Sequence, residues 1–512
     1  MKVKHIFCLL AGICFLNARA QNEFDALRYS TIGAGGTARS LGMAGSFSAI
    51  GPDASALFIN PACIGTFRRS ELNFGFQFQN TLNNATYIGS EIRESRLNFN
   101  IPSFNLVGST VKYDAGGKPK KTGLAAICYG FGVNRLATFN GRISFDALNT
   151  KSSVSDFLAE QATAENSAPF DLFFGGLGRI AYDAGAIDNI LGTNNYVSNY
   201  TDSIRNCNQS GEVLSNGAIY ENQFTGGLNF SNRFYVGLGL FYSGLRYSEN
   251  LSIFEQDLRP NSGDMKTLDY QFKFSDRGRA VGARFGLLVK VTEQMRVSAA
   301  VHTPRTFSIN SEYGYSVGIT ADPNAILTPP PAQYSDPLNT YKYKVTTPAR
   351  YNLGIGFVIS KIMLLNAEFD FYDYTTARLS ADDAVSFNAE NSAIRRTYRN
   401  VTNTRLGAEF NFPNPENKEQ SYRVRMGFAN QPSAFGTRAA GLDQILKKGN
   451  NMLACGFGFR DKEYYLDFSL TYGMSSGYYA PYVTSSSIHS SSSITNRRNR
   501  TILSFTLGLN LN

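Results

Sequence analysis

Residues suited to acid–base or metal chemistry are few and scattered in this chain of 512 residues. Only two histidines follow residue 20: His302, beside a Thr-Pro pair, and His489, inside a serine-rich stretch. Nucleophilic catalysis needs a nucleophile beside a base that a third group orients, and no such spacing surrounds either histidine. The sequence therefore predicts that the protein is not an enzyme. The scarcity of histidine also argues against a histidine-ligated metal or a haem held by two histidines.

Four cysteines follow residue 20, and their wide spacing signals neither a zinc site nor a disulfide framework. They are Cys63, Cys128, Cys207 and Cys455. A single disulfide could form in an oxidising compartment, and the sequence leaves the pair open. Residues 33–38 fit G-x-G-x-x-A formally, but no strand pattern precedes them and no βαβ unit follows. We therefore expect no cofactor and no metal.

The first twenty residues have the layout of a secretory signal peptide. Lys2 and Lys4 precede the apolar run Ile6–Leu16, and Ala18-Arg19-Ala20 provides an A-x-A cleavage site. That run is too short for a spanning helix, which needs about 20 residues. Removing residues 1–20 lowers the net charge from +9 to +6. No block of five or more basic residues is present, so a nucleic-acid partner is not expected.

From about residue 70 onward, apolar and polar residues alternate with period two, which is typical of strands with one apolar face. The charged fraction of 17% lies below the roughly 25% of ordinary soluble domains, while phenylalanine, tyrosine and glycine are abundant. Clear examples of the alternation are 72–79, 281–291, 464–473 and 503–511. The pattern predicts an all-β chain of about fourteen strands.

The connections between these strands alternate between short and long. The expected short turns include 231–232, 292–294 and 461–462, and the expected long connections include 80–94, 141–217, 249–278 and 475–498. Short turns on one side and long loops on the other are typical of a transmembrane antiparallel β-barrel of the outer membrane. A large soluble β-sandwich or propeller is the alternative, but it would carry more Lys and Glu on its polar strand faces.

The polar phase of each strand should face the barrel lumen. Oppositely charged residues on successive strands would then meet there and fix the register. We expect Glu368 and Asp370 to lie near Arg405, and Glu409 to lie near Arg423 and Arg425. The alternative role, a charged ring that selects a substrate, is also used by barrels.

Residues 21–69 do not show the strand pattern. They contain the small-residue stretch GTARSLGMAGSFSAIG (36–51), followed by PDASALFINPA (52–62), which ends in the triplet Asn60, Pro61, Ala62. This succession, followed by a strand, resembles the FadL/TodX family of outer-membrane long-chain fatty-acid transporters, including its NPA motif. The strand number of about fourteen is similar as well. The chain departs from the family in having Cys63-Ile64-Gly65 after the motif, and its divergent loops put the substrate in doubt.

The resemblance implies three regions: a signal peptide (1–20), an N-terminal plug or hatch (21–69), and a transmembrane barrel with long extracellular loops (70–512). A barrel of this size has a lumen wider than its own side chains can fill, so a small-residue segment is suited to closing it. The resemblance implies that plug residues contribute a hydrophobic ligand surface. The candidates are Phe47, Ile50, Leu57, Phe58 and Ile59.

In this family the substrate is captured by extracellular loops and leaves sideways through a kinked strand. The kink candidates here are Gly130, Gly132 and Asn134 of the third strand, where the alternation is irregular; glycine in a strand also marks bulges without any transport role. The capture loop would be 141–217, in which Val154–Glu165 has a helical pattern.

The resemblance therefore predicts outer-membrane transport of hydrophobic, long-chain fatty-acid-like molecules. Expected partners are hydrophobic small molecules and lipids, the outer membrane, and the barrel-assembly machinery during biogenesis, and we expect a monomer. Two alternatives stay open: a PorV-like component or adaptor for protein secretion, and a hemin-type receptor.

Overall fold

The computed structural model describes residues 23–33, 35–200, 205–259, 265–321, 333–335, 339–360, 362–382, 386–436, 449–485 and 489–511. The predicted signal peptide, residues 1–20, lies outside this part. No helix in the described ranges combines the length and the apolar character that a membrane crossing requires.

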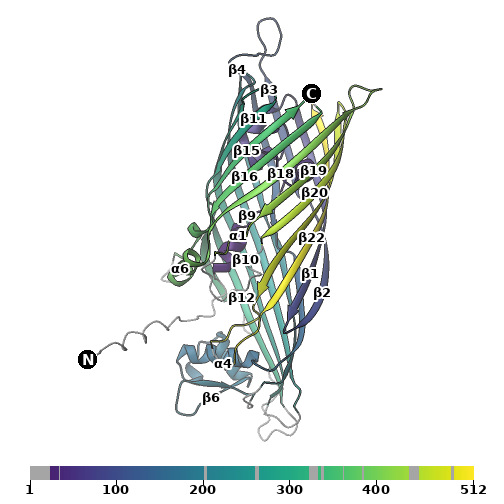
Figure 1. Cartoon of the computed structure of the whole chain (residues 1–512). Coiled ribbons are helices and arrows are strands. Elements are labelled where there is room, and N and C mark those ends of the chain that lie inside the picture. The colour runs from purple at the N-terminus through teal and green to yellow at the C-terminus, as the bar shows by residue number, and fades with distance from the viewer. Residues whose placement is uncertain are drawn as a thin grey trace, which may run out of the picture.

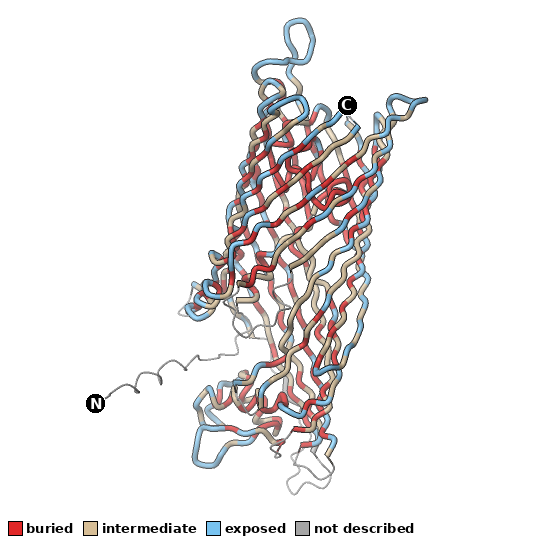
Figure 2. The backbone as a smooth tube through the Cα atoms, viewed as in Figure 1, coloured by how far each residue is buried: buried red, intermediate tan, exposed pale blue. Residues whose placement is uncertain are grey.

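The chain forms a closed antiparallel β-barrel of 14 strands, as the alternation predicted (Figure 1). The first and last strands close it, pairing from Ser70–Leu511 to Thr86–Thr495. Burial alternates along the strands, so that one face is buried toward the lumen and the other is exposed (Figure 2). Period-two patterning therefore sorts the apolar residues to the outside of the wall.

The barrel strands follow one another around the wall in chain order. They are β1 (Ser70–Tyr87), β2 (Ser90–Asn100), β3 (Ser103–Val111), β4 (Leu124–Thr138), β5 (Gly141–Asn149), β8 (Cys207–Phe230), β9 (Phe234–Asp257), β10 (Met265–Lys290), β11 (Met295–His302) and β12 (Thr306–Ala321). The second half comprises β14 (Asn339–Thr346), β15 (Arg350–Ile359), β16 (Met363–Asp373), β17 (Arg378–Ser380), β18 (Asn400–Pro413), β19 (Ser421–Gln431), β20 (Asn450–Arg460), β21 (Tyr464–Tyr479) and β22 (Ile494–Leu511). Short strands β6 (Ile187–Asn189), β7 (Tyr196–Ser198) and β13 (Gln333–Ser335) complete the set.

Several barrel strands consist of two ladder segments separated by a break. The break between β2 and β3 contains Pro102, that between β11 and β12 contains Pro304, and that between β14 and β15 contains Pro348. Proline lacks the amide hydrogen that a ladder needs, so it interrupts pairing where it occurs. Between β16 and β17 the chain instead forms the short helix η3 (Tyr374–Thr376).

The strands run further than the sequence suggested. The expectation of long loops at 80–94 and 249–278 was wrong: β1 and β2 pair to Tyr87–Ser90, and β9 and β10 pair as far as Gln256–Thr267. Beyond the apolar belt the outward residues of β9 become mostly polar, whereas its lumen-facing Leu251 and Ile253 are apolar. The outward-apolar alternation is therefore lost there while the hydrogen-bonded ladder continues.

One long connection folds over the end of the barrel, and we call residues 150–200 the cap (Figure 1). Its helix α4 (Val154–Glu165) has the bounds that the sequence predicted, and Ser153 and Asp156 form a capping box at its start. The cap also contains η2 (Pro169–Asp171) and α5 (Leu177–Asp183). Outside the cap lie α1 (Glu23–Ser30), α2 (Ala38–Leu41), α3 (Ala56–Ile59), η1 (Pro61–Thr66) and α6 (Asn388–Thr397).

Candidate functional site

Residues 35–66, here called the inner segment, lie within the barrel. Helix α2 contacts β20, β21 and β22, whereas η1 contacts β8, β9 and β10. Residues 37–65 are buried almost without exception. Thr37 caps α2 by accepting a hydrogen bond from the Ser40 amide, and the Ala38 amide donates to Thr506 Oγ1 of β22 at 2.8 Å. The segment is thus hydrogen-bonded to the wall as well as packed against it.

Asn60 and Pro61 fix the turn between α3 and η1. The Asn60 side chain accepts from the Ala62 amide at 3.0 Å and donates to the Leu287 carbonyl of β10 at 3.2 Å. Pro61 occupies the first position of η1, where no amide hydrogen is needed. The Asn60 side chain therefore caps η1 and also attaches it to the wall.

Inward-facing glycines make room for this turn. Gly227, Gly237 and Gly286 lie directly opposite one another on β8, β9 and β10. A Cβ at Gly237 would lie 2.2 Å from the Pro61 carbonyl carbon, and one at Gly286 would lie 2.1 Å from Asn60 Oδ1. The wall therefore approaches the backbone of the inner segment more closely than any other residue type would allow.

The five predicted ligand-surface residues are packing residues of the inner segment. Phe47, Ile50, Leu57, Phe58 and Ile59 are all buried, and none lines either of the two lumen cavities described below. Leu57 and Phe58 instead pack against β4, at Gly130 and Gly132. Their apolar character is used for contact with the wall, so the candidate ligand surface moves to other residues.

Gly130 and Gly132 lie in a regular ladder, paired with β3 and with β8. A Cβ at either would meet the Leu57 side chain at 2.6 or 2.9 Å, so these glycines accommodate the inner segment. Asn134 accepts a hydrogen bond from the Gly36 amide at 3.1 Å. The register of β4 against β8 shifts on either side of these residues, between Leu124 and Ala126 and between Arg135 and Ala137.

The predicted lumen ion pairs are confirmed. Arg405 pairs with both Glu368 (2.9 Å) and Asp370. Glu409 pairs with Arg425 at 2.6 Å and lies 3.5 Å from Arg423. These contacts hold β16, β18 and β19 in register and neutralise the interior.

The inner segment joins this network, which the sequence did not reveal. Arg39 binds Glu409 through Nε at 2.8 Å and Nη2 at 2.7 Å. The amides of Phe47 and Ser48 each donate to Glu368 Oε2 at 3.1 Å. Lumen carboxylates therefore bind the inner segment as well as their neighbours in the wall.

A second buried network surrounds Glu221 of β8. Arg305 pairs with it at 2.8 Å, and Arg284 pairs with it from the other side. Arg284 Nε donates to His302 Nδ1 at 2.9 Å, so the ring is a neutral tautomer whose Nε2 donates to the Ile59 carbonyl at 2.9 Å. His302 thus attaches the inner segment to the wall. Within the described residues no group of His, Cys, Asp or Glu side chains could hold a metal ion.

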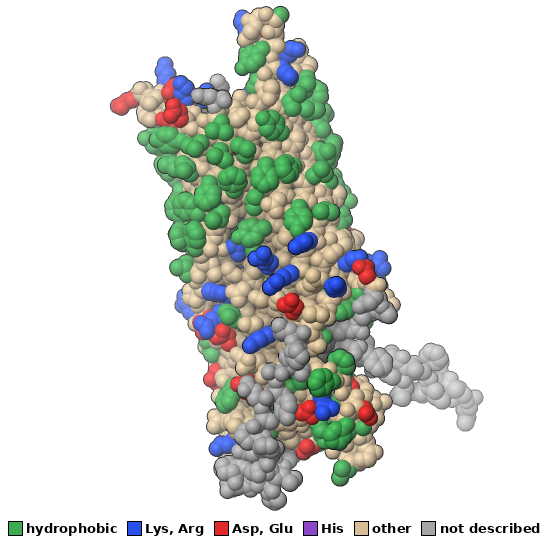
Figure 3. Space-filling model, turned by 180° about the vertical axis from the view of Figure 1, so that it is seen from behind, with side chains coloured by type: hydrophobic (Ala, Val, Ile, Leu, Met, Phe, Trp, Pro, Cys, Tyr) green, Lys and Arg blue, Asp and Glu red, His purple; other side chains and the backbone are tan. Residues whose placement is uncertain are grey.

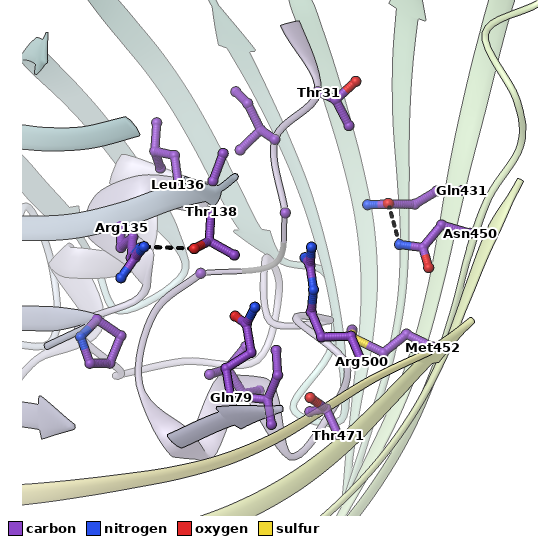
Figure 4. A pocket seen from close by; sticks show the side chains of 18 of the residues that line it. Thr31, Gln79, Arg135, Leu136, Thr138, Gln431, Asn450, Met452, Thr471 and Arg500 are labelled. Carbon is purple, nitrogen blue, oxygen red and sulfur yellow. Dashed lines mark hydrogen bonds between the residues drawn. The ribbon is translucent and has the colours of Figure 1, made fainter. Parts of the chain in front are cut away.

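An inner cavity of about 360 Å³ lies between the start of the inner segment and the wall (Figure 4). Four arginines line it (Arg28, Arg135, Arg498 and Arg500), together with apolar side chains such as Leu136 and Met452, but no carboxylate among the described residues does. Arg500 Nε has no hydrogen-bond partner in the described part of the chain. A cavity of this kind fits a molecule with an apolar body and an anionic group.

A second cavity of about 320 Å³, here called the aromatic cavity, lies nearer the cap. The wall contributes Tyr270, Phe272, Phe274 and Tyr315, and the cap contributes Phe157. Helix α1 separates the two cavities, and Arg28 lines both.

The wall is incomplete beside the inner cavity. β3 pairs with β4 as far as Ser103–Asn134, and β5 pairs with β8, but in the described residues no ladder joins β2 to β5. Arg96 of β2 spans this gap and donates to the Ser215 carbonyl at 2.8 Å. Side chains therefore bridge β2 to the neighbouring wall, whereas backbone hydrogen bonds join β3 to β4 and β5 to β8.

The cap is attached to the barrel end by buried polar contacts. Glu255 of β9 accepts hydrogen bonds from the Val154 amide at 2.8 Å and from the Ser153 hydroxyl. Burial raises the pKa of the Glu255 carboxyl to about 7. Arg205 pairs with Asp156 of α4 at 2.5 Å.

The four cysteines after residue 20 are all free; three of them are buried, and Cys455 is exposed. None of the four lines either lumen cavity.

Solved structures of a FadL homologue and of the transporter TodX are similar to this closed 14-stranded barrel. A FadL homologue from Pseudomonas aeruginosa aligns with a TM-score of 0.56 and 11% identity over 94% of this chain and 100% of that chain. The P. putida toluene transporter TodX aligns with a TM-score of 0.50 and 11% identity over 94% and 99%.

The deltaS2 mutant of the TodX monoaromatic hydrocarbon channel aligns with a TM-score of 0.53 and 12% identity over 94% of this chain and 99% of that chain. No protein-family profile and no curated protein matches the sequence. The chain thus has the FadL/TodX fold that the NPA-containing segment predicted.

Proposed function

We propose that the protein is an outer-membrane transporter that takes hydrophobic molecules through a plugged barrel, with residues 21–69 as the plug. The observation that carries the proposal is the pair of cavities in series, which share Arg28 of α1 and end beside the gap between β2 and β5. Molecules would enter the aromatic cavity under the cap, pass α1, occupy the inner cavity and leave sideways.

The substrate class follows from the lining of the inner cavity. Arg28 pairs with Asp25, but the other three arginines of the lining have no ion pair in the described part of the chain and favour an anionic group, while the apolar lining favours a chain or ring system. A long-chain fatty acid has both parts, whereas a neutral hydrocarbon would leave Arg500 without a counter-ion. We therefore propose fatty-acid-like anions as the substrates.

Binding of a radiolabelled long-chain fatty acid to the barrel in detergent tests this proposal, with its uncharged methyl ester as the comparison. Arg500→Gln should weaken binding of the acid about 10- to 150-fold, since a hydrogen bond to a charged group contributes about 1.5–3 kcal/mol. Binding of the ester should not change. Arg497→Gln is the matched control, because Arg497 lies on the same strand with its side chain exposed. Equal affinity for acid and ester would refute the anionic substrate.

The same proposal includes signal-peptide-dependent export, insertion by the barrel-assembly machinery and a monomeric state. The belt of exposed apolar side chains on the outer wall supports membrane insertion (Figure 3).

A second candidate, a PorV-like adaptor for protein secretion, is supported by the cap. Phe170, Phe174 and Leu191 are 82%, 78% and 95% exposed there, and exposed apolar groups of this kind often mark partner sites. Loss of surface-protein export on deletion of the gene, together with no saturable fatty-acid binding, would favour this adaptor role.

A further inference from the structure

The apolar belt on the outer wall ends abruptly on β9 and β10. On β10 and at Val291 directly after it, every outward position from Val291 to Val281 is apolar, and Val281 is 71% exposed. Ten residues at about 3.4 Å each and a tilt of about 40° give a height of roughly 26 Å, which matches the roughly 25 Å of a membrane band. The next outward residue toward the cap is Arg279. Arg279 therefore lies at the boundary of the hydrocarbon layer.

Several more cations surround Arg279 at this level. Arg246 of β9 and Arg277 of β10 lie directly opposite each other, and Asn310 separates Arg277 from Lys342 of β14. Ser308 likewise separates Arg279 from Lys344. We call Arg246, Arg277, Arg279, Lys342 and Lys344 the basic face. On the side of the molecule seen in Figure 3, basic side chains gather directly beside the apolar belt.

Most cations of the basic face have no counter-ion among the described residues. In the described part of the chain, only Lys344 of these five has an ion pair, to Asp382 at 2.5 Å. The outward carboxylate of Glu312 lies one row further from the belt. Like charges directly opposite on neighbouring strands are destabilising, so the Arg246–Arg277 pair carries an electrostatic cost that an external anion would relieve.

An apolar hollow adjoins the basic face on the membrane side. It has a volume of about 620 Å³ and is lined by Phe224, Leu240, Tyr242 and Val281, among others. These four side chains are exposed on the outer wall. Tyr242 lies directly opposite Val281, which is the next outward-facing residue after Arg279 on β10. The wall therefore presents an apolar surface and a group of cations next to each other, across the boundary of the belt.

We propose that this face binds phosphorylated lipids of the surrounding leaflet, with the phosphate groups on the arginines of the basic face and an acyl chain in the adjoining hollow. Guanidinium groups match phosphate oxygens in geometry and charge, and basic residues at a membrane boundary attract anionic head groups. The inference rests on the proposed membrane location but not on transport, because none of these residues lines a lumen cavity.

Native mass spectrometry of the detergent-purified barrel with bisphosphorylated lipid A tests the proposal. The triple variant Arg246→Gln/Arg277→Gln/Arg279→Gln should weaken lipid binding about 100-fold, at roughly a factor of five for each cation lost. All three side chains are exposed on the outer face, so the barrel should still fold. Heat-modifiable gel migration checks this.

The matched control removes the same charge elsewhere. Lys118, Lys120 and Lys121 are exposed on the 112–123 connection at the opposite end of the barrel, and their triple change to Gln should leave lipid binding unchanged. An equal loss in both triple variants would overturn the proposal, as would equal binding of dephosphorylated lipid A. Inorganic phosphate that binds as tightly as the lipid would also overturn it. Fatty-acid binding should be unaffected in every variant, which separates this test from that of transport.

Discussion

Replacing Gly237 by alanine adds one carbon where the wall meets the NPA turn. The new Cβ would lie 2.2 Å from the Pro61 carbonyl carbon, 2.3 Å from its oxygen and 2.4 Å from the Ala62 nitrogen. All three are backbone atoms, so no flexible side chain can move aside. The turn itself must shift away from β9 by about an ångström or more to restore an ordinary contact, which is rarely below 3.4 Å.

Overpacking of this kind costs about 1–3 kcal/mol. If this cost destabilises the state in which the plug is packed in the barrel, the ratio of protein with a displaced plug to protein with a packed plug rises about 5- to 150-fold. The displaced plug would leave part of the lumen open, so passage of small solutes should rise in proportion. Liposome swelling in a small sugar, at equal protein density, measures this passage.

Gly226→Ala is the matched control, since a Cβ at that neighbouring glycine meets no atom within 4 Å. It should leave the leak at the wild-type level. The reasoning is refuted if Gly237→Ala folds, as judged by heat-modifiable migration, and leaks no more than Gly226→Ala. A leak that rises equally in both variants would show that the wall, and not the contact with the turn, controls closure.

Two further effects follow from buried carboxylates. Burial raises the pKa of Glu255 to about 7. Attachment of the cap is therefore strongest below about pH 4, where a free carboxyl is also protonated. It weakens by up to roughly 3 kcal/mol as the pH rises through 7. Hydrogen exchange of α4 should therefore be faster at pH 8.5 than at pH 5.5, after correction for intrinsic rates, and Glu255→Gln should remove the difference. Glu409→Gln leaves Arg39 without its buried carboxylate, while Arg425 keeps its ion pair with Asp467, and breaking the buried pair should cost about 3–5 kcal/mol. Its urea unfolding midpoint should fall while that of Glu293→Gln, at an exposed turn, stays unchanged.

The barrel and its lumen charges could be predicted because both depend on period two. Alternation assigns each residue to one face, and consecutive hairpins then bring Glu368 beside Arg405 and Glu409 beside Arg425. The helix at Val154–Glu165 was also predictable, because its pattern depends on neighbouring residues of the chain. Each of these inferences needs only neighbouring strands or neighbouring residues.

The contacts of the inner segment could not be predicted in this way. Arg39 meets Glu409 across 370 positions of the chain, and nothing in either local pattern signals the pair. The abundance of glycine was visible in the sequence, but the role of the inward glycines depends on which backbone approaches them. Gly130 and Gly132 illustrate this: the sequence suggested a kink, whereas a regular ladder accommodates Leu57 there.

The inner segment is held more firmly than residues 31–33 before it, and in the proposed function this difference separates closure from passage. From Thr37 to Gly65 the inner segment is buried apart from Pro52, fitted against wall glycines and bound to Glu368 and Glu409. Residues 31–33, by contrast, are exposed or half-buried and line the inner cavity together with Gly35 and Gly36. Movement of α1 and this short linker would connect the two cavities without breaking any contact at the NPA turn. Under the proposed transport function, a substrate would pass while the inner segment stays in place, so Gly237→Ala should increase the leak without changing the affinity for fatty acid.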